Sequence, residues 1–555
     1  MSRVFLTKLK IKNLGPIEKD EVIFEPFTYF VGRNNAGKSH YLKAIEILLA
    51  TRAPSKDDII KLQHNKTQDI IIEGIFKGVQ NFTSLVSTSK HKVAIDEKIQ
   101  GEELVVVRKL NQDGSEFGLY NEDGTIYNPV GFPTNLLKIL PEPIHILATA
   151  DTVDELKNKQ NTALSKLKKE VLSPFFRELK DKTKQSLTEL DDFLHGESTE
   201  QRSRELADFE LHLKEELMGE FADVNPSVKF DLPTEEVIAK EMKIFLDDGY
   251  ESEIEQKGHG LQRAALLAML KVLAKHGNRY QDRPSPIFLI GELESFLHPY
   301  AQKQFAEVLE TLAEQYQVVT TTHSPFIITS KSIEGYRRIK KDTPAKSKSV
   351  RLGKDNIDIK SIKHHLESRG NLEGLFADRI VLIEGKHDEG FYYKLMEVFN
   401  IKVLSKKCTI FVKVSGSKQS RPVRNFYKQM KFDDVSVILD LDYLFSKDFK
   451  HLLKDIDLDE QYYLKIRQHI GLSEEDKDMK KEKIACELKE KGYPLVFDEI
   501  LDKLEEKRIF ILKHGAPENY YTNDLDQKDG WLNIKSESDL LEPTYLKQLM
   551  EKVLN

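Results

Sequence analysis

A short segment near the amino terminus has the residue types and spacing of a phosphate-binding loop. Residues 32–39 read Gly-Arg-Asn-Asn-Ala-Gly-Lys-Ser and fit the pattern G-x-x-x-x-G-K-[ST]. Gly32 and Gly37 allow the backbone to curl so that its N–H groups face phosphate oxygens. Lys38 can place a cation on the β- and γ-phosphates of ATP, and Ser39 can offer a hydroxyl to Mg²⁺. The predicted nucleotide-binding residues of this loop are Gly32, Asn35, Gly37, Lys38 and Ser39.

Three later motifs are of the kinds that a P-loop ATPase uses. An apolar strand ends near Glu292, where such enzymes hold Mg²⁺ and polarise the attacking water. Another strand delivers His323, which suits a sensor of the γ-phosphate. Gly258, Gly260 and Gln262 lie at a helix start, where backbone N–H groups could face the γ-phosphate of a partner subunit's ATP. A lone histidine is more often structural, but the order of the motifs after the P-loop favours the functional interpretation.

Two acidic clusters follow apolar strands in the last third of the chain. One strand leads into Glu384 and Asp388 in the pattern Glu-Gly-x-x-Asp, and another leads into Asp440 and Asp442. Because carboxylates at the carboxyl ends of neighbouring strands converge, these acids are predicted to meet. Four such acids make an oxygen cage for one or two Mg²⁺ ions, with Mn²⁺ or Ca²⁺ as alternatives. Two metals about 4 Å apart can activate water and stabilise the leaving oxygen in phosphodiester cleavage.

Between the two acidic clusters lies a strongly basic stretch. Residues 402–432 carry nine basic side chains and no acidic one, in a chain of formal net charge −7. This local excess predicts a surface that follows a phosphate backbone next to the metal site. A solvated helix face is the alternative, because one-signed runs also occur on ordinary surfaces.

The elements that must position these residues can be read from the hydrophobic pattern. The P-loop lies between a buried strand and an amphipathic helix, and short alternating strands after it suggest an antiparallel layer beside the main sheet. A second α/β unit opens at residue 379. No apolar run approaches the ~18 residues of a membrane helix, and two cysteines make no disulfide framework. A cytoplasmic protein without a membrane partner is therefore expected.

Together these motifs resemble the ABC, SMC and RecF ATPases, and most closely the OLD (overcoming lysogenisation defect) family, over nearly the whole chain. The two acidic clusters resemble the TOPRIM fold of topoisomerases, primases and OLD nucleases. The resemblance implies an α/β protein in which an ABC-type P-loop ATPase head with a helical insertion precedes a Rossmann-like TOPRIM domain. The implied parts are an ATPase lobe (1–150), a helical dimerisation arm (151–225), a second ATPase lobe (226–335), a basic connector (336–375) and a TOPRIM nuclease domain (376–555).

The resemblance also implies roles for single residues. Glu384 would be a general base or metal ligand, with Asp388, Asp440 and Asp442 as metal ligands. A late Lys-x-Gly-x-x-Glu segment is similar to the last motif of OLD TOPRIM domains. There, Lys513 would stabilise the pentavalent phosphate and Glu518 would complete the metal shell.

The chain departs from the family at the end of the second ATPase strand. The usual Glu-Glu-Pro-Glu is replaced by Gly291-Glu292-Leu293-Glu294. In the favoured alignment Gly291 replaces the metal-binding acid and Glu292 remains the catalytic base, so that hydrolysis would be slow. In the competing alignment Glu292 binds the metal and Glu294 is the base.

The sequence therefore predicts an ATP-regulated, metal-dependent endonuclease, with an anti-phage defence role implied by the resemblance alone. DNA is favoured over RNA as substrate, at least a homodimer is expected, and a defence-system partner protein or a retron RNA/DNA is an open partner. Two alternatives remain: cleavage of RNA such as tRNA, and an ATP-driven clamp or sensor that cuts nothing.

Overall fold

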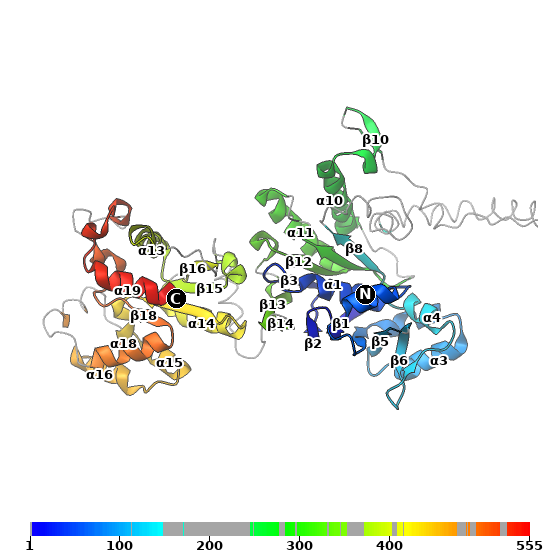
Figure 1. Cartoon of the computed structure of the whole chain (residues 1–555), viewed down its shortest axis with the longest axis horizontal. Helices are drawn as coiled ribbons and strands as arrows, with labels where there is room; N and C mark the ends of the chain where they lie inside the picture. Colours follow the sequence, from blue (N-terminus) through cyan, green and yellow to red (C-terminus); the bar gives the residue numbers. More distant parts are fainter. Residues whose placement is uncertain are drawn as a thin grey trace, which may run out of the picture.

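The computed structural model describes most of two α/β lobes (Figure 1). It covers residues 3–147, 245–276, 283–351, 371–401, 408–473, 496–521 and 530–554, apart from single positions within these ranges and a few isolated residues between them. The predicted helical arm at 151–225 lies outside the described residues, apart from Glu170. None of the helices in the described ranges combines the length and the apolar content needed to cross a bilayer.

Two six-stranded sheets build the N-terminal lobe. The antiparallel sheet has the order β2-β1-β4-β5-β6-β7, and the second sheet has the order β14-β13-β3-β12-β11-β8, parallel except between β13 and β14. The strands of the first sheet are Phe5–Leu14, Ile17–Ile23, Ile70–Lys77, Glu103–Asn111, Gly114–Tyr120 and Ile126–Tyr127 for β1, β2, β4, β5, β6 and β7. Those of the second are Phe27–Val31, Pro143–Leu147, Ile287–Gly291, Gln317–Thr322, Tyr336–Thr343 and Lys346–Arg351 for β3, β8 and β11 to β14. The antiparallel layer expected beside the main sheet is thus confirmed.

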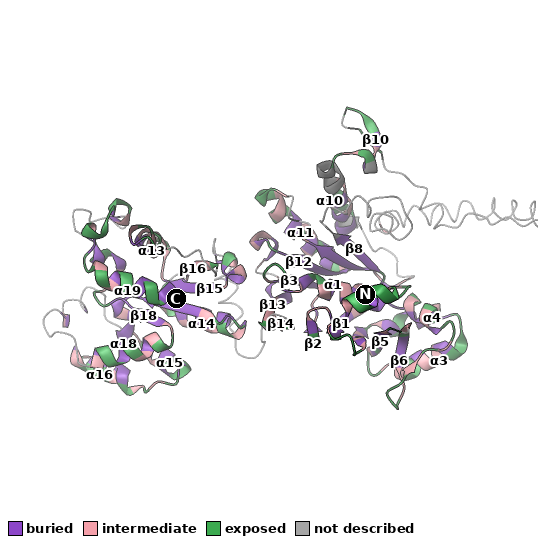
Figure 2. Cartoon of the chain, viewed as in Figure 1, coloured by how far each residue is buried: buried purple, intermediate pink, exposed green. Residues whose placement is uncertain are grey.

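The burial of these strands follows their place in the two sheets (Figure 2). Every residue of β3 and β12 is buried, as expected for parallel strands covered on both faces. Most of β4 alternates between buried and half-buried positions, because only one face of its sheet meets the core. Helices of this lobe are α1 (Lys38–Leu49), α2 (Lys56–Leu62), α3 (Ser89–Lys98), α4 (Phe132–Lys138), α10 (His259–His276) and α11 (Pro299–Gln315), and a hairpin joins β9 (Phe245–Asp247) to β10 (Glu251–Glu253).

The C-terminal lobe is built on a four-stranded parallel sheet of order β16-β15-β17-β18. Its strands are β15 (Arg379–Ile383), β16 (Thr409–Lys413), β17 (Asp434–Leu439) and β18 (Ile509–Ile511). Its helices are α13 (Lys386–Val398), α14 (Ser420–Gln429), α15 (Lys447–Asp455), α16 (Gln461–His469), α18 (Val496–Glu506) and α19 (Pro543–Leu554). The β15 strand is buried at every position and ends one residue before Glu384, as predicted.

The expected connector at 336–375 is wrong for its first part. Residues 336–343 form β13, which pairs in parallel with β3, the strand that leads into the P-loop. The segment looked like a linker because it is rich in lysine and arginine, but Arg337 is buried and donates to the carbonyl of Ile23 at 2.8 Å. Long basic side chains can bury their stems, and β14 is an edge strand, where lysines are common. Residues 352–370 lie outside the described residues.

A substitution at Gly335 tests how closely β13 approaches β3. A Cβ atom at Gly335 would lie 1.9 Å from the carbonyl oxygen of Phe27, which is backbone and cannot give way easily. We expect Gly335→Ala to lower the free energy of unfolding by about 3 kcal/mol, since the added methyl group forces a strand apart. Urea unfolding of the variant measures this. Gly114→Ala is the matched control, because a Cβ there meets nothing within 4 Å; an equal loss in both variants would contradict the close approach.

Candidate functional site

The P-loop has the backbone geometry that its sequence predicts. Gly37 adopts a left-handed conformation, with φ of 104°, directly before α1, and Asn35 has φ of 62°. Lys38 is the first residue of α1 and is buried, and its ammonium donates to the carbonyls of Gly32 at 3.2 Å and Arg33 at 3.3 Å. Ser39 is exposed in the first turn of the same helix. The loop therefore curls around its own lysine at a helix N-terminus.

The hairpin of β13 and β14 packs against the P-loop. A Cβ at Gly32 would lie 2.5 Å from the carbonyl oxygen of Ile339, so only glycine fits there. The hydroxyl of Ser347 donates to the carbonyl of Ala36 at 2.6 Å. Sequence reasoning missed Ser347, and no local signal marks it, because its contact depends on a strand more than 300 residues away.

Glu292 and His323 come to the P-loop lysine from the ends of β11 and β12. The Lys38 ammonium lies 2.5 Å from Nε2 of His323 and 3.8 Å from the carboxylate of Glu292. A lysine ammonium only donates, so Nε2 must accept, which requires a neutral imidazole. Burial, and next the charge of Lys38, lower the pKa of His323, in keeping with the neutral form. The 3.3 Å approach of His323 to Glu292 is then a contact of a neutral ring and not an ion pair.

Glu294 is held inside the protein by hydrogen bonds to the end of β12. Its side chain is buried, and its carboxylate accepts from the Thr322 hydroxyl at 2.6 Å and from the His323 N–H at 3.0 Å. Burial raises the pKa of Glu294, although the Thr322 hydrogen bond opposes that rise. Of the two acids after β11, Glu292 is thus the one whose carboxylate lies 3.8 Å from the Lys38 ammonium.

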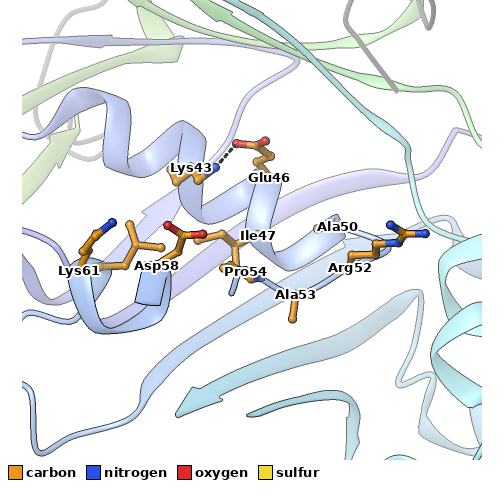
Figure 3. Close-up of a pocket in the computed structure, with 10 residues that line it drawn as sticks. Lys43, Glu46, Ile47, Ala50, Arg52, Ala53, Pro54, Asp58 and Lys61 are labelled. Carbon is orange, nitrogen blue, oxygen red and sulfur yellow. Dashed lines mark hydrogen bonds and ion pairs between the residues drawn. The ribbon is translucent and has the colours of Figure 1, made fainter. Parts of the chain in front are cut away.

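The remaining ATPase motif begins a helix, as expected. Gly258 is exposed and precedes α10, which starts at His259 and carries Gly260 and Gln262 in its first turns. A surface pocket of about 500 Å³, lined among others by Lys43, Glu46 and Arg52, is a different place (Figure 3). Its lining begins at Lys43, about 8 Å along α1 from Lys38, and includes none of the residues 32–39, so it is not the nucleotide site.

Three carboxylates meet at one edge of the C-terminal sheet. Glu384 follows β15, and Asp440 and Asp442 follow β17, which is the parallel neighbour of β15. Ligand atoms of the three acids all lie within 4.8 Å of one another, with Asp440 buried and the other two half-buried. A set of carboxylate oxygens without histidine or cysteine fits a hard cation such as Mg²⁺, Mn²⁺ or Ca²⁺ better than zinc.

Comparisons with known proteins match both parts of the chain. Residues 5–129 and 145–328 match the AAA ATPase domain family, and residues 375–442 match the TOPRIM domain of overcoming lysogenization defect-like proteins. The chain belongs to the OLD family of ATPase–TOPRIM proteins.

Two relatives span most of this OLD-family chain. The Old nuclease of Escherichia phage P2 is 29% identical over 437 residues, which are 75% of this chain and 74% of the relative. The OLD nuclease of Thermus scotoductus is 23% identical over 403 residues, 69% and 72% of the two chains. An Smc head domain from Pyrococcus furiosus overlaps with 63% of this chain and 96% of its own, at 16% identity and with a TM-score of 0.39.

Two of the predicted metal ligands of the TOPRIM domain stand apart from the three-acid group. Asp388 is in the first turn of α13, and its carboxylate accepts from the Gly385 N–H at 3.0 Å, so it caps the helix that follows Glu384. Glu518 is exposed in a short 3₁₀ helix, and Lys513 lies 3.7 Å from Asp498. The Lys513–Glu518 segment nevertheless borders the site, because the Leu441 N–H donates to the Gly515 carbonyl at 3.2 Å.

Several cations of the basic stretch are paired or buried. In the described part of it, Lys413 pairs with Glu389 at 2.7 Å, Arg421 pairs with Asp455 at 2.6 Å, and Arg424 is buried. Acids distant in sequence neutralise these cations, which a count along the chain cannot show. Lys418 is exposed and lies near Glu384, since the Gly416 N–H donates to the Glu384 carbonyl at 3.3 Å. Residues 402–407 lie outside the described residues.

Proposed function

We propose that this OLD-family protein is an ATP-hydrolysing endonuclease whose TOPRIM domain cuts DNA with the help of divalent metal ions. The single observation that carries the proposal is the meeting of Glu384, Asp440 and Asp442 within 4.8 Å at the ends of two adjacent strands. The nuclease names of the two relatives, which cover most of this chain, support it.

The three acids would hold one or two Mg²⁺ or Mn²⁺ ions. When bound, such ions activate water and stabilise the charge that develops on the scissile phosphate and the leaving oxygen. Burial of Asp440 keeps its carboxylate oriented toward the site, and helix capping by Asp388 fixes the turn that carries Glu384. Lys418 and Lys513, both exposed at this edge, are proposed to contact the phosphate backbone.

ATP would bind at the P-loop, with its phosphates on the backbone N–H groups of residues 32–39 and on Lys38. Ser39 is proposed to hold Mg²⁺, Glu292 to orient and deprotonate the attacking water, and the neutral His323 to contact the γ-phosphate. With Gly291 in place of an acid, hydrolysis is expected to be slow. The exposed Gly258, ahead of α10, would contact the ATP of a second subunit together with Gly260 and Gln262, so we propose at least a homodimer.

The decisive experiment offers three substrates to the purified protein. Plasmid, linear DNA and tRNA are incubated with Mg²⁺ or Mn²⁺, with and without ATP, and with EDTA as the control. Cleavage of plasmid or linear DNA that EDTA abolishes supports the proposal. Cleavage of tRNA alone would favour the RNA alternative, and the absence of any metal-dependent cleavage would favour a clamp or sensor.

The anti-phage role is proposed from membership of the OLD family alone. Cells that express the protein should plate phage at least tenfold less efficiently than cells expressing an Asp440→Asn variant. If a panel of unrelated phages plates equally well on cells with either protein, the defence proposal is contradicted, while the proposed ATPase and nuclease activities are unaffected.

Replacing each of the two acids that follow β11, Glu292 and Glu294, by glutamine tests the ATPase assignment. We expect Glu292→Gln to lower ATP turnover about 100-fold while ATP still binds, because the carboxylate that lies 3.8 Å from the Lys38 ammonium loses its basicity. Steady-state phosphate release and nucleotide titration measure the two properties. Glu307→Gln, on the exposed side of α11, is the control. A larger loss in Glu294→Gln than in Glu292→Gln would favour the competing alignment.

A further inference from the structure

Arg33, one of the unspecified positions of the P-loop pattern, contacts the TOPRIM domain directly. The guanidinium of Arg33 forms an ion pair with the carboxylate of Asp378. The backbone of the same Arg33 belongs to the phosphate cradle, since its carbonyl accepts from Lys38 at 3.3 Å and from the Ala36 N–H at 3.1 Å. One residue thus connects the nucleotide loop with the nuclease domain.

Asp378 holds together the amino ends of two strands of the TOPRIM sheet. It directly precedes β15, and its carboxylate also accepts from the Cys408 N–H at 2.8 Å, one residue before β16. The carbonyl of Cys408 in turn accepts from the N–H groups of Asp378 at 2.9 Å and Arg379 at 3.1 Å. The other end of β15, about 17 Å away, carries Glu384.

The second metal-bearing strand is held by a different part of the ATPase. From β13, Arg338 donates to the carbonyl of Lys431 at 2.6 Å and covers the ring of Phe432 at 3.7 Å, and Lys340 pairs with Asp433 at 2.7 Å. These partners immediately precede β17, which leads to Asp440 and Asp442. Figure 1 shows β13 and β14 on the side of the N-terminal lobe that faces the C-terminal lobe.

The two strands that bear the metal acids are each contacted at their amino ends by the ATPase, β15 by the P-loop and β17 by β13. The strands also pair with each other, and a largely buried ion pair of 2.6 Å joins Arg379 of β15 to Asp434 of β17. A movement of the P-loop would act on the amino end of β15 and would shift Glu384 at its other end. Catalytic groups must lie within about 0.5 Å of their productive positions, and a misplacement of about 1 Å can lower the rate about 100-fold. Such a shift would therefore lower the rate of cleavage.

We propose that Arg33 is a positioning residue that carries the nucleotide state of the P-loop, through Asp378 and β15, to the metal site. The Arg33 side chain is 62% exposed and Asp378 is 15% exposed, so the guanidinium can exchange partners while the carboxylate stays on the Cys408 N–H. Phosphates bound on the loop compete with Asp378 for the guanidinium. Loss of the pair loosens the ends of β15 and β16, so that bound nucleotide lowers cleavage.

The inference rests on the proposed nuclease function and is tested first by cleavage. In wild type a non-hydrolysable ATP analogue should slow metal-dependent DNA cleavage at least threefold. Asp378→Asn should cut at the slow rate with or without the analogue, while binding the analogue with a Kd within about twofold of wild type. Arg33→Gln combined with Asp378→Asn should be no slower than Asp378→Asn alone, since both remove one interaction.

The matched control removes another ion pair between the ATPase and the TOPRIM domain. Asp433→Asn breaks the contact with Lys340, which is not part of the P-loop, and should keep the threefold response to the analogue. A response in Asp378→Asn as large as that of wild type, or a wild-type nuclease indifferent to the analogue, would overturn the inference and leave the nuclease proposal intact.

A second measurement judges the inference even if no substrate is cut. Hydrogen–deuterium exchange should speed up at the amides of Asp378, Arg379 and Cys408 when the analogue binds wild type. In Asp378→Asn the exchange should be fast throughout. If the exchange rates of wild type do not change when the analogue binds, the proposed link is refuted. If no substrate is cleaved, only the nuclease function is refuted.

Discussion

Lys38→Ala is expected to weaken ATP binding about 100-fold, or by about 2.7 kcal/mol. The ammonium is the buried cation of the P-loop, and hydrogen bonds between a charged donor and a phosphate are among the strong ones. Titration with a fluorescent ATP analogue measures the loss. Metal-dependent cleavage without nucleotide should persist, because the three acids of the TOPRIM domain belong to a different sheet.

Lys43→Ala is the control for this experiment. Lys43 lies on the same helix, α1, but its ammonium pairs with Glu46 at 3.1 Å and does not enter the P-loop. It should bind ATP as wild type does. A Lys38→Ala protein that hydrolyses ATP at the wild-type rate would refute the P-loop assignment.

Asp440→Asn is expected to reduce nucleic-acid cleavage about 1000-fold. Asp440 is the buried member of the three-acid group, and asparagine keeps its shape but removes the charge that would hold the metal. Loss of several kcal/mol of transition-state stabilisation corresponds to that factor. Plasmid nicking at several Mg²⁺ and Mn²⁺ concentrations measures the rate, and titration with Mn²⁺ measures the metal affinity.

Glu397→Gln provides the matched control for Asp440→Asn. Glu397 lies on α13 and is 71% exposed, so it removes one carboxylate from the same domain without touching the metal site. Its cleavage rate should stay within about twofold of wild type. Cleavage by a folded Asp440→Asn at the wild-type rate would show that these acids do not hold the catalytic metal.

The structure separates residues that the sequence grouped together. Glu384, Asp388, Asp440 and Asp442 were predicted as one cage, yet the carboxylate of Asp388 caps α13 while the other three converge. An acid four residues into a strand–turn–helix unit can serve either role, and the direction of the side chain decides between them. The same holds for Glu292 and Glu294, which are two residues apart but differ in burial and partners.

The sequence by itself determined the P-loop, the strand-end positions of Glu292 and His323, and the pairing of two acidic strand ends. These are local properties, because a glycine-rich loop or an apolar strand that ends in an acid is encoded within about ten consecutive residues. The match to the OLD family then fixed the order of the domains.

Only the tertiary structure decided how the two domains are joined. The pairing of β13 with β3, the support of the P-loop by Ser347 and the Arg33–Asp378 ion pair all link residues more than 300 positions apart. Such contacts leave no periodic trace in the neighbouring sequence, since each partner looks like an ordinary polar surface residue until the chain folds. For the same reason a count of charges along the basic stretch does not show that Glu389 and Asp455 neutralise part of it.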